Sequence, residues 1–379
     1  MNIFFLIFHG FSESSGVSKK ILSQIKGMRE LGHHVDVCTY SVTCEGNRVR
    51  MINDRIIQNY GKSRWAAIRK KVDFHTIEEY VSNNPIDFIY VRSFHNAHPF
   101  TIHLFDSFRK KGVKIVMEIP TYPYDQEYKG FSFATRFGIQ IDKLFRRKLA
   151  QKINAIVTFS NHDEIFGKRT IRIANGVDFE SIPLQNKSGH SDHVIHLTGV
   201  AEVHYWHGYD RLIAGLGEYY QTAPEKEVYF HIIGGIGPSE MYDSVHAPGF
   251  HELIEKYGIA KYIIFHGSKY GDELDDFFND TDVAIGSLGR HRCGITHIKT
   301  LKNREYAARG IPFIYSETDS DFENMPYILK VPADESPVDI PTLLDFYRKV
   351  DIQPAMIRNS IRQLSWKEQM KIVIKQALR

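Results

Sequence analysis

The chain has 379 residues, of which 42% are hydrophobic and 25% are charged, and its formal net charge is +3. This composition is ordinary for a soluble globular protein, and the length suggests about two domains of ~150 residues each. The weak, dispersed positive charge argues against a nucleic-acid-binding protein and suits anionic small molecules as partners. Cys38, Cys44 and Cys293 lack paired spacing, so the sequence predicts neither a disulfide framework nor a zinc site.

The apolar run at 2–8, NIFFLIF, predicts a first β-strand and not a signal peptide, because it lacks a preceding basic residue and a small-residue cleavage site. No apolar run approaches the ~18 residues that would span a bilayer. We therefore expect a cytoplasmic protein, with at most peripheral contact with the inner membrane.

Strand-like and helix-like segments alternate along the first half of the chain. Val17, Ile21, Ile25 and Met28 recur at helical spacing, and Gly32 ends this helix. With strands at 2–8 and 34–40, the helix forms a β-α-β unit, the building block of a parallel sheet. Further strands are predicted at 86–92, 113–120, 155–160 and 170–176, with a helix at 99–112.

A short polar stretch without periodicity, 184–192, is interpreted as a linker. The alternation then restarts, with strands predicted at 193–200, 228–235, 262–268, 282–288 and 312–316, helices at 210–220, 250–258, 272–280 and 301–309, and a last amphipathic helix at 365–378. The sequence thus predicts an α/β fold with two Rossmann-like, doubly wound domains facing a cleft. We expect these domains to comprise 1–185, with the C-terminal helix 357–379 added, and 190–350.

The loop before the helix at 301–309 carries the strongest signal for a ligand. Residues 290–304 hold five Lys or Arg residues and two histidines, but no acidic residue. Loops that leave the strands bind ligands in open α/β sheets, and a helix N-terminus favours an anion. Gly294 would let the backbone approach a phosphate closely. The alternative is a solvated basic turn capped by Thr296.

Lys302 and Glu305 share a helix face, and two interpretations of this pair are possible. They could form an ordinary surface pair, which stabilises by only ~0.3–0.5 kcal/mol. Alternatively, Lys302 binds phosphate and Glu305 accepts hydrogen bonds from two vicinal hydroxyls, as on a ribose. Their spacing alone leaves both interpretations open.

Loops of the first half offer weaker candidates. Glu118, Tyr122, Tyr124 and Asp125 follow a strand and suit a carbohydrate, through ring stacking and hydroxyl hydrogen bonds; a rigid proline turn is the alternative. Gly16 lies where the first crossover helix begins, suited to a phosphate or sugar, but no G-x-G-x-x-G fingerprint supports a nicotinamide enzyme.

The basic helical segment 133–152 could rest on an anionic membrane, although we favour a packed helix with a solvated basic face.

Five segments in order resemble the group 1, or family 4, retaining glycosyltransferases of the GT-B fold. They are GVSKKILSQIKGMRELGHHVDV at 16–37, TFSNHDEIFGKRTIRIANGVD at 158–178, IIFHGSKYGDELDDFFNDTDVAIGSL at 263–288, LKNREYAARGIPFIY at 301–315, and SWKEQMKIVIKQAL at 365–378. The resemblance implies an N-terminal acceptor domain, a C-terminal nucleotide-sugar donor domain, and a terminal helix that crosses back to the first.

The resemblance also implies roles for particular residues. Glu305 matches the second glutamate of the family's E-x7-E motif and would hold the ribose. Gly294 and Ile295 would meet the donor's phosphates or sugar, with Lys269 and Tyr270 near the base.

The chain departs from the family where His297 stands in place of the first glutamate. Gly199-Val200 and His207-Gly208 replace the family's Gly-Arg and Lys-Gly. Both usual cations are therefore missing, and Arg290, Arg292 and Lys302 are the candidates to replace them. We expect His297 and Lys302 to act in catalysis.

These features together predict a metal-independent, retaining glycosyltransferase. It would move a sugar from a UDP- or GDP-linked donor to a glycan or lipid-linked acceptor in surface-polysaccharide biosynthesis, without a further cofactor. A nucleotide-sugar epimerase or hydrolase of the same fold is one alternative, and a non-catalytic nucleotide- or sugar-binding module is another.

Overall fold

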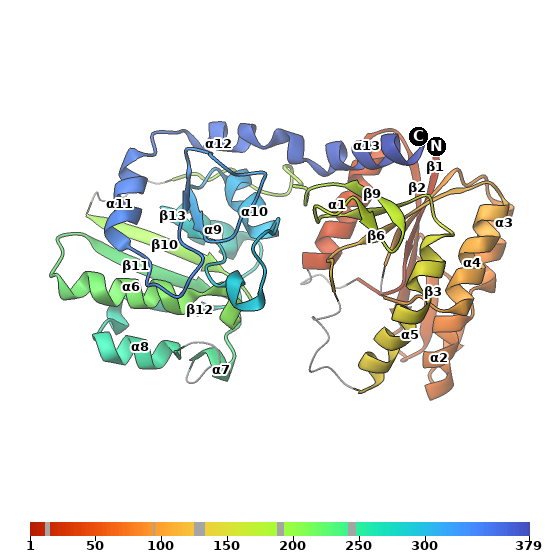
Figure 1. The fold of residues 1–379 in the computed structure, drawn as a ribbon, viewed down its shortest axis with the longest axis horizontal. Helices are drawn as coiled ribbons and strands as arrows, with labels where there is room; N and C mark the ends of the chain where they lie inside the picture. Colours follow the sequence, from red (N-terminus) through yellow and green to blue (C-terminus); the bar gives the residue numbers. More distant parts are fainter. Residues whose placement is uncertain (12–15, 94, 125–132, 188–192, 242–247) are drawn as a thin grey trace. The chain divides into compact units, whose positions relative to one another are not determined.

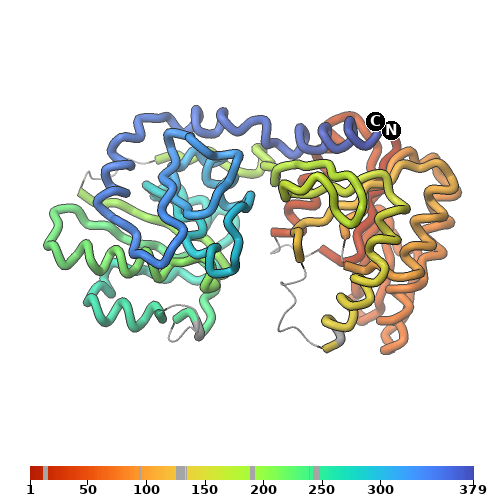
Figure 2. The backbone as a smooth tube through the Cα atoms, in the orientation of Figure 1, coloured from red at the N-terminus to blue at the C-terminus, as the bar shows by residue number. Residues whose placement is uncertain are grey.

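A computed structural model describes residues 1–11, 16–93, 95–124, 133–187, 193–241 and 248–379. The chain forms two compact units, of which unit 1 comprises Met1–Gly176 with Leu364–Arg379, and unit 2 comprises Val177–Gln363. Both ends of the chain belong to unit 1 (Figure 2). None of the described helices has the length and apolar character needed to cross a membrane.

Unit 1 is built on a nine-stranded sheet of order β4-β3-β2-β1-β5-β6-β7-β9-β8 (Figure 1). Its strands are β1 (Asn2–Ile7), β2 (His34–Val42), β3 (Arg48–Ile52), β4 (Arg55–Gly61), β5 (Phe88–Arg92), β6 (Lys114–Ile119), β7 (Ala155–Thr158), β8 (Glu164–Ile165) and β9 (Lys168–Arg172). The central strands are parallel, whereas β3, β4 and β8 pair antiparallel with their neighbours. Strands β1 and β5 are buried on both faces, as a parallel sheet covered by helices requires.

Helices cover both faces of this sheet: α1 (Gly16–Glu30), α2 (Arg64–Val72), α3 (His75–Asn83), α4 (Pro99–Lys110), α5 (Phe133–Ala150) and α13 (Trp366–Ala377). One apolar core packs residues of α3 and α4 against the sheet, and a second packs α1 and α13 against the other face. Helix α13 approaches α1 closely at Gly27, where an added Cβ would lie 2.8 Å from the carbonyl carbon of Trp366. The predicted return of the C-terminal helix to the first domain is thus confirmed.

Unit 2 contains a six-stranded, all-parallel sheet of order β12-β11-β10-β13-β14-β15. Its strands are β10 (Val194–Val200), β11 (Glu227–Ile233), β12 (Ile263–Gly267), β13 (Val283–Ile285), β14 (Phe313–Tyr315) and β15 (Ile328–Lys330). Its helices are α6 (Tyr209–Gln221), α7 (Pro238–Met241), α8 (Phe250–Tyr257), α9 (Asp272–Asn279), α10 (Leu301–Arg309), α11 (Ile340–Lys349) and α12 (Pro354–Ser360), with 3-10 turns η1 (Tyr205–His207), η2 (Ala260–Tyr262), η3 (Arg290–Cys293) and η4 (Arg362–Leu364). Two doubly wound α/β units were predicted, and this part of the fold prediction is confirmed.

Part of the stretch interpreted as a linker packs against unit 2. The Gln185 side-chain amide donates to the carbonyl oxygens of Phe278 (2.8 Å) and Thr281 (2.6 Å). Lys187 forms an ion pair of 2.5 Å with Asp282. Gln185 and Lys187 are thus bonded to the end of α9 and the loop after it, and residues 188–192 of the predicted linker lie outside the described residues.

Candidate functional site

The strand order of unit 2 reverses between β10 and β13, which lie side by side at the centre of the sheet. Such a reversal opens a crevice at the carboxyl ends of the strands, where open α/β sheets bind ligands. Three loops meet this edge: the segment from β10 to α6, the segment from β13 to α10, and the turn after β14. We call the buried polar side chains of Tyr209, Ser287, Lys302 and Glu317 the switch-point cluster.

Tyr209 opens α6 and lies under the end of β10. Its ring fits against Gly199, because a Cβ on that glycine would lie 2.7 Å from the tyrosine Cζ and Oη. Tyr209 is buried, yet its hydroxyl has no hydrogen-bond partner among the residues described by the structure. The Gly199-Val200 pair, which departs from the family's Gly-Arg, therefore makes room for an aromatic ring.

Lys302 lies in the first turn of α10, which runs from Leu301 to Arg309 as predicted. The residue is half-buried, but its Nζ is shielded from solvent and, within the part of the chain that the structure describes, has no hydrogen-bond partner. Nζ lies 5.9 Å from the centre of the Tyr209 ring. Burial, and then repulsion from Arg290, lower the pKa of Lys302 to about 7. The attraction of Glu317 offsets these effects only in part, so a bound anion would stabilise the ammonium.

Glu317 is the main site residue that sequence reasoning missed. It follows β14, is only 2% exposed, and neither carboxylate oxygen accepts a hydrogen bond from any other described residue. Burial, reinforced by Asp319, raises the pKa of Glu317 to about 7, against the opposing attraction of Arg290 and Lys302. Buried carboxylates are almost always paired, so this one is poised for a ligand.

The turn that carries Glu317 also pairs with the segment of His297. His297 forms a parallel β-bridge with Thr318, and Ile298 N donates to Thr318 O at 3.0 Å. The His297 side chain itself is exposed, and its Nδ1 lies 2.9 Å from Thr296 Oγ1. The turn that carries the Glu317 carboxylate thus lies beside the segment where histidine stands in place of the glutamate of the family that the sequence resembles.

His207 and Arg290 complete the surroundings of Lys302. His207 is buried, and burial followed by the charges of Lys302 and Arg290 lowers its pKa well below the ordinary value. Its Nδ1 accepts a hydrogen bond from His204 N at 2.9 Å. A neutral imidazole therefore occupies the position of the family's lysine. The Arg290 guanidinium lies 5.7 Å from the Trp206 ring centre.

Arg292, predicted to bind the donor, is already paired. Its guanidinium donates to both Asp210 oxygens at 2.9 and 2.7 Å, to both Glu335 oxygens, and to Tyr205 O. Hydrogen bonds from Arg292 hold the pKa of Glu335 down, to about 2. These contacts favour a structural role, and we leave Arg292 out of the proposed donor site.

The amides of Gly294 and Ile295 are also engaged. Gly294 N donates to His291 O at 2.8 Å, and Ile295 N to Arg290 O at 3.2 Å. Gly294 adopts φ +68° and ends η3, with open space where a Cβ would be. Its geometry therefore serves the turn, and a phosphate contact through these amides remains a prediction.

Glu305 does not pair with Lys302, which removes the surface-pair alternative. Instead, Arg309 donates to Glu305 Oε1 from Nε (3.2 Å) and Nη2 (2.9 Å), while its Nη1 lies 2.7 Å from Asp275. Among the described residues, Glu305 Oε2 accepts no hydrogen bond, and the side chain is one-third exposed. This oxygen is available to ribose hydroxyls.

Lys269 and Tyr270 follow β12, the edge strand. Lys269 pairs with Glu273 at 3.3 Å, and Tyr270 is exposed.

In unit 1, Glu118 is fully buried among side chains of α1, β5 and β6. It pairs with Arg92 and, at 3.5 Å, with Lys20, and it accepts hydrogen bonds from Gln24 (2.6 Å) and Tyr90. Burial raises the pKa of Glu118, but Arg92 and Lys20 outweigh it and bring the pKa down to about 2. A carboxylate satisfied in this way cannot face an acceptor directly, so the predicted role of Glu118 gives way to a structural one.

The other unit 1 candidates differ in exposure. Tyr124 is buried, and its hydroxyl donates to Asp142 at 2.6 Å. Tyr122 is half-buried and contacts the edge of the Phe166 ring at 5.6 Å. Gly16 begins α1 and is exposed, whereas Asp125 lies outside the described residues.

Two Asp-x-Asp sequences bear on the expected independence from metal. Asp319 and Asp321 both pair with the buried Arg304, and Asp282 accepts hydrogen bonds from Lys187 and Tyr347. These carboxylates neutralise cations of the protein.

The fold is similar to those of several solved structures. The catalytic domain of starch synthase IV from Arabidopsis thaliana, bound to ADP and acarbose, is 12% identical over 100% of this chain and 99% of its own, with a TM-score of 0.63. A trehalose-6-phosphate structure from E. coli, bound with UDP-2-fluoro glucose, is 12% identical over 100% and 99%, with a TM-score of 0.57. Sucrose-phosphate synthase from Thermosynechococcus elongatus is 14% identical over 100% and 97%, with a TM-score of 0.54.

This chain has the GT-B fold. The predicted resemblance to GT-B glycosyltransferases is confirmed at the level of the fold, over the whole chain. No protein-family model matches the sequence, and no curated protein matches it either.

Proposed function

We propose that this GT-B protein is a glycosyltransferase that moves a sugar from a UDP- or GDP-linked donor to a glycan or lipid-linked saccharide, with retention of anomeric configuration. One observation carries the proposal: the switch-point cluster holds a cation, a carboxylate and two hydroxyls that are buried without hydrogen-bond partners among the described residues. Leaving such groups unpaired costs about 1–3 kcal/mol each, and a sugar diphosphate would satisfy all of them.

Each group has a role in the proposed reaction. Lys302 and Arg290 stabilise the diphosphate as the bond from the anomeric carbon to the phosphate oxygen breaks. Glu317 accepts hydrogen bonds from donor-sugar hydroxyls, and Glu305 binds the ribose. The acceptor hydroxyl forms the new bond on the leaving-group side and passes its proton to the departing phosphate oxygen. His297, exposed beside this turn, remains a candidate for contact with the acceptor or sugar.

Single-turnover assays with a panel of nucleotide-sugars test the proposal. Transfer to a saccharide acceptor, undiminished by a chelator, supports a metal-independent transferase, and Glu305→Ala should weaken nucleotide binding. Free sugar or an epimer without an acceptor would indicate the hydrolase or epimerase alternative. Nucleotide binding without turnover on any acceptor would indicate a binding module.

We further propose that the enzyme acts in the cytoplasm, in the assembly of a surface polysaccharide. The proposal rests on the lipid-linked or glycan acceptor suggested above. Loss of a defined surface polymer on deletion of the gene, restored by wild type but not by Lys302→Met, would support it. An unchanged surface would contradict it.

A further inference from the structure

Helix α5 of unit 1 exposes apolar side chains on the side that faces solvent. Phe133, Phe137 and Leu144 are 83%, 59% and 73% exposed. Phe137 and Leu144 follow Phe133 by four and eleven residues, so the three side chains lie within about 40° of one another around the helix axis. Soluble proteins seldom expose three large apolar residues along one stripe, so the stripe needs an occupant.

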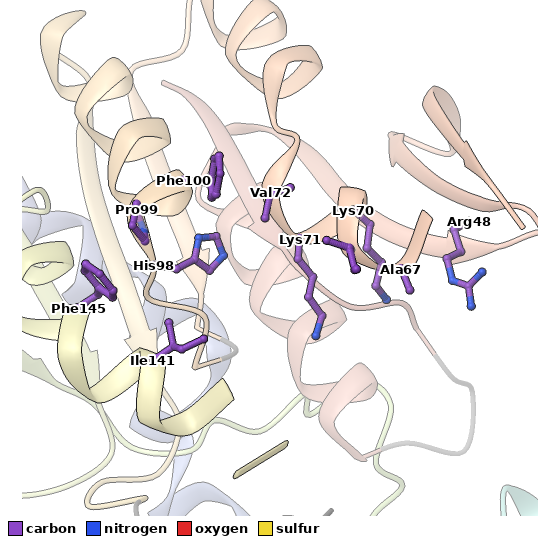
Figure 3. Close-up of a pocket in the computed structure, with 11 residues that line it drawn as sticks. Arg48, Ala67, Lys70, Lys71, Val72, His98, Pro99, Phe100, Ile141 and Phe145 are labelled. Carbon is purple, nitrogen blue, oxygen red and sulfur yellow. The ribbon is translucent and has the colours of Figure 1, made fainter. Parts of the chain in front are cut away.

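Helix α2 contributes a second set of exposed apolar residues. Trp65 is 72% exposed and Ile68 is 52% exposed. A groove of about 750 Å³ connects α2, the start of α4 and α5, and Ile68, Phe100, Ile141 and Phe145 lie along it (Figure 3). The two helices therefore border one continuous surface, which we call the α2–α5 face.

Within α2 and α5 as the structure describes them, the exposed charged side chains of the α2–α5 face are positive. Its exposed cations include Arg64, Lys71, Arg136, Lys143, Arg147 and Lys148. Helix α2 has no acidic residue, and the one in α5, Asp142, is buried and accepts hydrogen bonds from Ala97 N and the Tyr124 hydroxyl. Arg136, Lys143 and Arg147 flank the apolar stripe on one side, at ~100° per residue.

We propose that the α2–α5 face docks on an anionic lipid bilayer. The cations attract anionic headgroups, and the apolar stripe beside them enters the boundary with the acyl chains. A soluble polyanion would engage the cations and leave Trp65, Phe137 and Leu144 in water. The proposal is independent of the sugar-transfer reaction, because all of these residues belong to unit 1 and none belongs to the switch-point cluster.

Co-sedimentation of the full chain with phosphatidylcholine vesicles, with and without phosphatidylglycerol, tests the docking. We expect binding that requires phosphatidylglycerol and weakens with salt. Lys143→Glu with Arg147→Glu should reduce vesicle affinity by roughly 20-fold or more, and Phe137→Ser with Leu144→Ser by at least about tenfold. Matched controls are Lys367→Glu with Lys375→Glu on α13, and the exposed Met356→Ser in unit 2, which should bind as wild type.

Trp65 provides a direct reporter of insertion. Brominated lipids should quench its fluorescence, and Trp65→Phe should remove most of this quenching while the protein still sediments with vesicles. Circular dichroism and the melting temperature verify that each variant folds. No binding to anionic vesicles, equal losses in the controls, or full binding by Phe137→Ser with Leu144→Ser would overturn the proposal. If polyphosphate abolished vesicle binding and the apolar substitutions had no effect, the α2–α5 face would be a polyanion-binding surface and the proposal of membrane docking would be wrong.

Discussion

Replacing Lys302 by methionine should separate stability from function in unit 2. Burial lowers the pKa of this lysine from 10.5 to about 7. That shift corresponds to about 4 kcal/mol of lost stability at pH 7 as an upper limit, and about 2 kcal/mol once relaxation and water access reduce it. Lys302→Met should therefore raise the melting temperature of the ligand-free protein by about 4–8 °C. It should weaken UDP or GDP binding roughly 30-fold, because a charged hydrogen-bond donor to the diphosphate is lost.

The sign of the pH dependence makes this prediction specific. Between about pH 7 and 10.5 the unfolded chain binds the Lys302 proton and the folded chain releases it, so wild-type stability rises with pH in that window. The advantage of the methionine variant should be largest below pH 7 and vanish near pH 10.5.

Urea unfolding across this range, and calorimetric titration with UDP and GDP, measure both effects. The exposed Lys256→Met serves as a control in the same unit and should change neither. The reasoning would be refuted if Lys302→Met were less stable than wild type at pH 7, if the stability difference did not change with pH, or if nucleotide binding were unchanged.

Three further outcomes are expected. Glu317→Gln should lower the rate of sugar transfer at least about tenfold while UDP binding changes little; loss of UDP binding instead would place the carboxylate elsewhere. Glu305→Ala should weaken nucleotide binding by about 1–2 kcal/mol, measured by calorimetry. The variant should still fold, because Arg309 retains its ion pair with Asp275. Nucleotide binding as tight as that of wild type would rule out the ribose contact. Glu118→Gln should destabilise unit 1 by about 3–5 kcal/mol in urea unfolding, because Arg92 and Lys20 lose their counter-charge. The pKa of Glu118 is depressed, so its stabilisation is present above about pH 4.5 and is lost as pH falls toward 2; a variant as stable as wild type at pH 7 would contradict this role.

The doubly wound fold could be predicted because each of its signals is local. Gly310, directly after Arg309, marks the end of α10 in the sequence, and in the structure it is the helix C-cap with φ +80°. The antiparallel extension β3–β4 is absent from the predicted strands, although Arg48–Met51 alternates polar and apolar residues as a strand does. A signal was present in Asn53-Asp54, where both residues adopt positive φ in the hairpin turn.

The candidate site could be predicted only in part, because partners come from distant segments. Arg292 lies in a stretch without acidic residues, yet its partners Asp210 and Glu335 come from 82 residues earlier and 43 residues later. Glu317 becomes significant only when β14 lies beside β13 and brings its turn to Lys302. The partners of Arg292 and the position of Glu317 both depend on the tertiary fold, which the periodicity of the sequence does not reveal.

The discontinuity of unit 1 has a consequence for the order of events on the ribosome. Leu364–Arg379 belongs to unit 1, and Trp366, Met370 and Val373 fill its core between α1 and the sheet. During synthesis all of unit 2 emerges before these residues do. We therefore expect nascent chains to complete unit 2 first, while the face of the unit 1 sheet that α1 and α13 share stays only partly covered until α13 arrives.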